Sequence, residues 1–145
     1  MLRSKPDGRG GLEHNSYKSS DAVNSIKWFC LDDPMCADTY RYYQGLLAFR
    51  KAYANLRLAT RKDVLETISP IPCSDPHVVA FRIHGKENSH IISVFNASFS
   101  TVEFPLPAGK WNIFVNGCRA GTHPLAAAEG RTFVEPLAAL ILVKE

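Results

Sequence analysis

The sequence predicts an α+β protein in which an N-terminal loop and one long helix precede an antiparallel β-sandwich. Two patterns support this prediction. Apolar residues recur at helical spacing over residues 37–58, whereas after Pro76 they occur in short alternating runs separated by turn residues. Three prolines within residues 70–76 separate the two patterns. We therefore expect one division of the chain, into residues 1–76 and 77–145.

The chain is expected to start as a loop. Residues 1–13 are glycine-rich and show no periodicity. The irregular chain then continues to residue 36, with one helical turn near residues 20–25 that Ser20 or Asp21 caps. This loop is too polar to build a core, and its Tyr, Asp, Asn and Trp residues make it a candidate binding surface.

Two helices are expected next. The long one, residues 37–58, carries a stripe of large apolar side chains, with Tyr43 and Leu47 beside it: Tyr42, Leu46, Phe49, Tyr53 and Leu56. Such a stripe is typical of core packing rather than of a ligand face. Thr60 and Asp63 then match a capping box, which predicts a short helix that ends before Pro70.

The remaining chain is expected to form short strands. The runs with strand periodicity are residues 78–84, 90–96, 101–106, 110–115, 131–135 and 138–143. Turns are expected at residues 85–88 and 107–109 and at Asn116-Gly117, and residues 126–130 are expected to be a loop. Trp111 is expected in the core, although an exposed Trp111 would be able to stack on a sugar.

Composition excludes several classes of protein. Over 145 residues, 46% are hydrophobic and 21% are charged, as in a globular domain. The net charge is only +3 and the Lys and Arg residues are scattered, so we expect no nucleic-acid partner. No apolar run approaches the length of a membrane span, so we expect no membrane partner.

No metal or cofactor site is expected. The four cysteines, Cys30, Cys36, Cys73 and Cys118, form no Cys-x-x-Cys pair, and no two histidines have zinc-finger spacing. Cys30 and Cys36 are close enough for a local disulfide, but free thiols are the simpler interpretation. The glycine-rich residues 7–11 lack the Gly-Lys-Ser/Thr ending of a phosphate loop. Asn96-Ala97-Ser98 is a formal glycosylation sequon that we expect to be incidental.

A resemblance to a known family rests on three groups of residues. The first group combines residues 1–5 with the ordered set His14-Asn15-Ser16-Tyr17, Asp21, Asn24 and Trp28. The second group is residues 42–51, and the third is residues 111–117. The first group resembles a stretch of type I pullulanases, which belong to glycoside hydrolase family 13 of the α-amylase superfamily. The second is similar to the helix that follows in those enzymes, and the third to their C-terminal β-sandwich.

The resemblance implies that the chain is the C-terminal fragment of a debranching enzyme. The first segment would follow the eighth strand of a (β/α)8 barrel, and the long helix, a remnant of that barrel, would be its last. The family hydrolyses α-1,6-glucosidic bonds with three carboxylates from earlier barrel strands. No catalytic residue can therefore be assigned here, and we expect the fragment to be inactive. We expect a cytoplasmic location, with a secreted parent enzyme left open.

The resemblance also implies a substrate-binding role for the loop. Asp21 and Asn24 match positions whose side chains hydrogen-bond glucose units, and Tyr17 and Trp28 match flanking aromatic positions. The partner would be an α-glucan: pullulan, branched starch or glycogen. In the alternative interpretation, Asp21 only caps a turn while Asn24 and Trp28 fix the loop's shape. The glycine-rich residues 6–12 replace a shorter link in the family.

Two other functions compete with this interpretation. The chain would act as a free-standing glucan-binding module if Trp111 or a strand face offered an exposed aromatic platform. Alternatively, residues 77–145 would be a purely structural module. In a fragment without its barrel, we expect part of the helix stripe to pack on the sandwich and the remainder to promote self-association.

Overall fold

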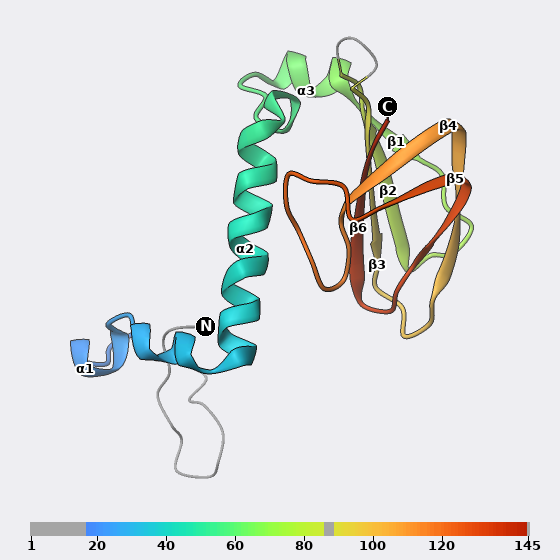
Figure 1. Ribbon diagram of the computed structural model, residues 1–145. Coiled ribbons are helices and arrows are strands. Elements are labelled where there is room, and N and C mark those ends of the chain that lie inside the picture. Colours follow the sequence, from blue (N-terminus) through green and yellow to red (C-terminus); the bar gives the residue numbers. More distant parts are fainter. Residues whose placement is uncertain (1–16, 86–88, 145) are drawn as a thin grey trace. The chain divides into compact units, whose positions relative to one another are not determined.

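The computed structural model describes residues 17–85 and 89–144 (Figure 1). The chain forms two compact units, residues 1–43 and residues 44–145. Several expectations fall outside the described residues: the N-terminal loop with its glycines, the first part of the pullulanase-like stretch, and most of the turn at residues 85–88. The division at residue 76 stays a prediction.

The first unit is helical. It contains α1 (Asp21–Asn24), the 3-10 helix η1 (Trp28–Asp32) and the start of α2 (Pro34–Ala52). The expectation that the long helix begins near residue 37 was wrong. The carboxylate of Asp33 accepts hydrogen bonds from the backbone N–H groups of Met35 at 2.9 Å and Cys36 at 3.1 Å, so it caps a helix that begins at Pro34.

Helix α2 also ends earlier than the apolar stripe predicts. It stops at Ala52, and the 3-10 helix η2 (Ala54–Leu56) follows. The guanidinium of Arg57 donates hydrogen bonds to the backbone oxygens of Arg50, Lys51 and Tyr53. Arg50 and Lys51 lie in the last turn of α2, where carbonyls lack partners within the helix, so the folded-back Arg57 caps this end.

The short second helix, α3 (Arg61–Thr67), is confirmed together with its cap. Thr60 Oγ1 accepts the N–H of Asp63 at 3.1 Å, and the Thr60 hydroxyl in turn donates to the Asp63 carboxylate at 2.7 Å. The strand β1 (Ile68–Ile71) follows directly, so the first strand already includes Pro70 of the proline-rich segment that separates the two sequence patterns. Proline is tolerated there because β1 is an edge strand.

Five further strands complete one antiparallel sheet with the order β1-β2-β3-β6-β4-β5. They are β2 (Val78–Ile83), β3 (Ile91–Asn96), β4 (Val102–Val115), β5 (Ala126–Val134) and β6 (Ala138–Lys144). Two expectations about this region were wrong. Residues 107–109 do not separate two strands, because β4 is continuous with a register shift between Pro105 and Lys110. Residues 126–130 are not a loop but the start of β5.

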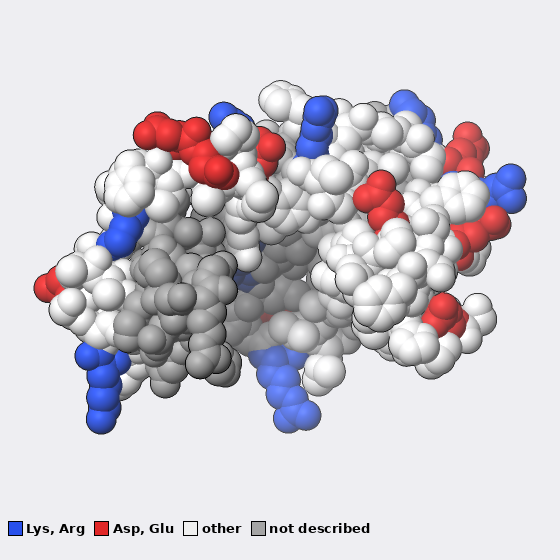
Figure 2. All heavy atoms as spheres, turned by 90° about the horizontal axis from the view of Figure 1, so that it is seen from below, with Lys and Arg blue, Asp and Glu red and all other residues white. Residues whose placement is uncertain are grey.

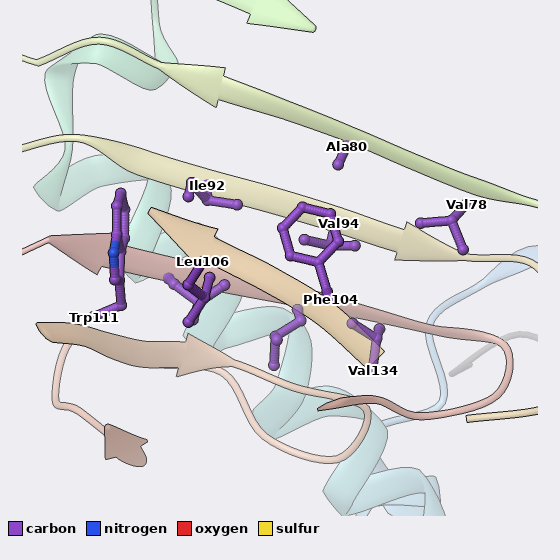
Figure 3. Packing of buried hydrophobic residues seen from close by; sticks show 10 residues of the cluster. Val78, Ala80, Ile92, Val94, Phe104, Leu106, Trp111 and Val134 are labelled. Atoms are coloured by element: carbon purple, nitrogen blue, oxygen red, sulfur yellow. The ribbon is translucent and has the colours of Figure 1, made fainter. Parts of the chain in front are cut away.

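The sheet curls into a sandwich around one apolar cluster (Figure 3). Phe104, Leu106 and Trp111 of β4 lie against Ile92 and Val94 of β3, and residues of β2, β5 and β6 complete the cluster. Trp111 is fully buried and its Nε1–H donates to the Pro107 oxygen at 2.9 Å. The predicted α+β class with a β-sandwich is confirmed.

A second cluster joins the C-terminal part of α2 to the opposite face of the sheet. Phe49, which is 2% exposed, packs with Ile83, Ile91, Phe114 and Val143. The rings of Tyr53 and Phe114 lie close to it, with centroid distances of 4.5 Å and 5.7 Å. The expectation that part of the helix stripe packs on the sandwich is met at these residues. No helix in the described ranges is both long and apolar enough to cross a membrane.

Candidate substrate-binding loop

The four predicted binding residues lie within one short segment of the first unit. Tyr17 is in the turn before α1, Asp21 and Asn24 are the first and last residues of α1, and Trp28 opens η1. Asp21 and Asn24 are three residues apart on a helical turn, so the backbone brings them to one side. Their role in sugar binding stays a prediction.

Asp21 does not act as the cap of this turn. Ser20 occupies the N-cap position, and its backbone oxygen, not its side chain, accepts the N–H groups of Val23 and Asn24 at 3.0 Å. The Asp21 side chain is exposed, and no hydrogen bond or ion pair holds it within the described part of the chain. Its carboxylate is thus available to an external donor such as a sugar hydroxyl.

Asn24 has a role inside the loop. Its Nδ2 donates to the Ser19 oxygen at 2.8 Å, and this bond closes the turn around α1. Lys27 secures the other end, because its Nζ donates to the Ala22 oxygen at 2.6 Å. The bond from Asn24 to Ser19 favours the interpretation that Asn24 shapes the loop, whereas no such bond holds the exposed Asp21 side chain within the described residues.

The loop also exposes large apolar side chains. Tyr17 is 85% exposed and Trp28 is 60% exposed. Phe29, which follows Trp28 in η1, is 68% exposed and was missed by the sequence reasoning, although its place beside Trp28 was a visible signal. Aromatic rings with a polar neighbour suit the apolar faces and hydroxyl edges of sugars.

The described residues contain no group of side chains that could hold a metal ion. Within residues 17–85 and 89–144, no three His, Cys, Asp or Glu side chains gather as a metal site would require. All four cysteines are free, so the local disulfide between Cys30 and Cys36 is not formed. One visible face of the molecule carries acidic and basic side chains intermixed (Figure 2).

The sandwich offers no Trp111 platform. Trp111 has no exposed surface, so the stacking role considered for it is excluded. A cavity of about 710 Å³ does open in the second unit beside Tyr53, Asn55 and His84. Its walls come from the segment after α2 and from the end of β2, not from the predicted loop.

Sequence comparisons show that this chain is similar to pullulanases. Residues 66–119 match a family model described as "Pullulanase, all-beta domain". The pullulanase of Bacillus subtilis strain 168 is 29% identical over 101 residues, which are 67% of this chain and 14% of the relative. The chain thus spans about a seventh of that relative's length.

Solved structures share the fold. A pullulanase from Bacillus acidopullulyticus has a TM-score of 0.80 at 24% identity, covering 92% of this chain and 17% of its own. A type I pullulanase from Bacillus subtilis strain 168, complexed with maltose, has a TM-score of 0.74 at 23% identity, covering 94% of this chain and 19% of its own. The resemblance indicated by the sequence is confirmed.

Proposed function

We propose that this chain, which resembles the C-terminal part of type I pullulanases and carries their all-beta domain, is the C-terminal portion of an enzyme that hydrolyses α-1,6-glucosidic bonds in pullulan and branched starch or glycogen. The match of residues 66–119 to the pullulanase all-beta domain carries this proposal. The complex of a similar enzyme with maltose supports an α-glucan as the substrate. The likeness extends beyond that domain, since the aligned structures cover 92% and 94% of the chain.

Within that enzyme, residues 17–28 would form one wall of the substrate cleft. Asp21 would accept hydrogen bonds from sugar hydroxyls, because its carboxylate is exposed on a turn that other residues hold in shape. Tyr17 and Trp28 would contact sugar rings with their exposed faces. Asn24 would mainly hold the loop. The β-sandwich would be structural.

A chimera tests the role of Asp21. The whole 145-residue chain replaces the aligned C-terminal segment of the Bacillus subtilis pullulanase, and pullulan hydrolysis is measured. Asp21→Ala should lower kcat/KM by about 10- to 100-fold, the effect of losing a charge-assisted hydrogen bond of about 1.5–3 kcal/mol. Asp32→Ala, which removes an exposed carboxylate from the same unit, is the matched control and should leave kcat/KM unchanged. Equal effects of the two substitutions would refute the assignment.

The isolated chain should not hydrolyse glucans. Glycoside hydrolysis needs two carboxyl groups facing each other across the scissile bond. In the pullulanases that this chain resembles, the catalytic carboxylates come from earlier barrel strands. Incubation of the purified chain with pullulan should release no reducing ends, whereas the Bacillus subtilis enzyme does under the same conditions. Release by the purified chain would refute the proposal of an inactive fragment.

A further inference from the structure

We propose that one end of the β-sandwich is a binding site for a phosphate-class oxyanion, formed by Arg82, His84, His90 and Lys144. The four residues come from three neighbouring strands or their ends: β2, β3 and β6. They follow the candidate loop (residues 17–28) by more than 50 residues in the sequence, and none of them belongs to that loop. The proposal therefore stands independently of the enzyme assignment.

Strand register brings these side chains together. Arg82 pairs with Ile92, whose side chain belongs to the inner cluster, so Arg82 points to the same inner face. His84 and His90 continue the β2–β3 ladder beyond the pair Ile83 and Ile91, and the backbone N–H of Lys144 donates to the His90 oxygen at 2.9 Å. Even-numbered residues of β2, β3 and β6 share this face, so all four side chains emerge where the apolar core ends.

The hydrogen bonds around His84 and His90 leave a ring N–H of His90 available to donate to a ligand. The rings of His84 and His90 meet edge to face with a centroid distance of 5.6 Å. Ser69 Oγ of β1 lies 3.0 Å from His84 Nε2 and orients that ring. The N–H of Gly85 donates to His90 Nδ1 at 3.4 Å, which places the proton of neutral His90 on Nε2. His90 Nε2 is therefore a donor.

The positive charges of this cluster are not compensated within the described residues. Arg82 Nε is buried and has no hydrogen-bond partner there. None of the ion pairs among the described residues involves Arg82 or Lys144. Burial lowers the pKa of His90, and the neighbouring Arg82, His84 and Lys144 lower it further. An anion between these groups would satisfy the buried donor and relieve the repulsion.

The donor set selects a tetrahedral oxyanion. A guanidinium offers parallel N–H donors, lysine offers a mobile ammonium, and histidine adds a third direction, which together suit the oxygens of phosphate. A single carboxylate would use fewer of these donors. Free phosphate and a phosphate monoester carried by a sugar share this chemistry, and the experiment below distinguishes them.

Calorimetry and NMR on the full chain test the proposal. Calorimetry should show one inorganic phosphate bound per chain, whereas chloride at equal ionic strength should show no such binding. In NMR titrations, phosphate should raise the pKa of His90. Arg82→Gln should weaken phosphate binding by about tenfold or more. Arg119→Gln removes an exposed arginine from the loop after β4 and should bind phosphate like the wild type. Lys144→Gln repeats the test should Arg82→Gln fail to fold.

Each outcome decides the question. Glucose 6-phosphate binding more tightly than inorganic phosphate would assign the site to a phosphorylated sugar, and the reverse would assign it to free phosphate. The proposal is overturned if the His90 resonance titrates identically with and without phosphate. It is equally overturned if Arg119→Gln weakens binding as much as Arg82→Gln and Lys144→Gln do. A negative phosphate result would not change the result expected for pullulan hydrolysis by the chimera, because the two experiments test different sites.

Discussion

Single residues connect loops of this sandwich that are distant in sequence, and Asn96 is the clearest case. Its buried Nδ2 donates to the oxygens of Ser100 at 2.8 Å and Glu135 at 2.9 Å, while its Oδ1 accepts the N–H of Ser98 at 2.9 Å. The sequence showed this residue only as part of a sequon. Since the amide nitrogen is buried and bonded, Asn96 is a structural residue that joins the turn after β3 to the end of β5.

Asn96→Ala should therefore lower the free energy of unfolding by about 2–3 kcal/mol, because several buried backbone groups lose their partner. Urea denaturation followed by circular dichroism measures this. Phe99→Ala in the same turn removes a side chain that is 87% exposed and should change stability little. A destabilisation by Asn96→Ala no larger than that of Phe99→Ala would contradict the structural role.

Gly45 allows a close approach between α2 and the loop after β4. A Cβ atom at Gly45 would lie 2.0 Å from the backbone oxygen of Ala120, so Gly45→Ala must displace backbone. We expect a loss of about 1–3 kcal/mol in thermal or urea unfolding. Gly121→Ala is the matched control, since its Cβ would meet nothing within 4 Å. Similar stabilities for the two variants would refute this contact.

The pH dependence of stability should depend in part on His90. Burial, followed by the charges of Arg82, His84 and Lys144, lowers the pKa of His90 below its usual 6.5. The unfolded chain therefore binds a proton more readily, so this contribution to stability is fully present above pH 6.5 and is lost as the pH falls below that value. In phosphate-free buffer, His90→Gln should reduce the loss of stability between pH 7 and 5.

The exposed His123 provides the control for that measurement, and His123→Gln should leave the wild-type pH profile in place. A His90→Gln profile that runs parallel to the wild type over the same interval would show that His90 does not carry the effect.

Among the elements, α2 depends on its packing against the sheet. Phe49 is buried between Tyr53 and Phe114, so Phe49→Ala should destabilise the protein by about 3–5 kcal/mol. Leu47→Ala on the same helix removes a side chain that is 66% exposed, and it should cost far less. Chemical denaturation of both variants measures the difference, and comparable losses would mean that the second cluster does not anchor the helix.

The sequence predicted the elements better than their ends. The stripe through Phe49 correctly identified α2, but its start depends on the Asp33 cap and its end on Arg57, which lies beyond the helix. Residues 126–130 are alanine-rich and have low strand propensity, yet pairing with residues 110–113 of β4 makes them a strand. The ends of α2 and the strand at residues 126–130 are therefore determined by contacts with other parts of the chain and not by local propensity.

The candidate site was predictable to a similar extent. The helical turn expected near residues 20–25 is present as α1, while the sugar-binding role of Asp21 and Asn24 stays a prediction. The bond from Asn24 to the Ser19 oxygen was not predictable, because it depends on how the chain enters the turn. The basic cluster around His90 was missed because its members are up to 62 residues apart and meet only through strand register.

For the whole molecule, an exposed apolar side of α2 predicts self-association. Tyr43 is 58% exposed and Leu47 is 66% exposed, and they lie one helical turn apart. Sedimentation should show oligomers that increase with protein concentration, and Leu47→Glu should shift the chain toward monomer. A wild-type chain that remains monomeric at high concentration would contradict this prediction.

The central claim is that this chain supplies the C-terminal portion of a pullulan-hydrolysing enzyme. The most direct measurement is the release of reducing ends from pullulan by the chimera of this chain with the preceding part of the Bacillus subtilis pullulanase. Linear amylose, which lacks α-1,6 bonds, serves as the control substrate. We expect the chimera to hydrolyse pullulan and to hydrolyse little amylose. A folded chimera that leaves pullulan intact would contradict the central claim.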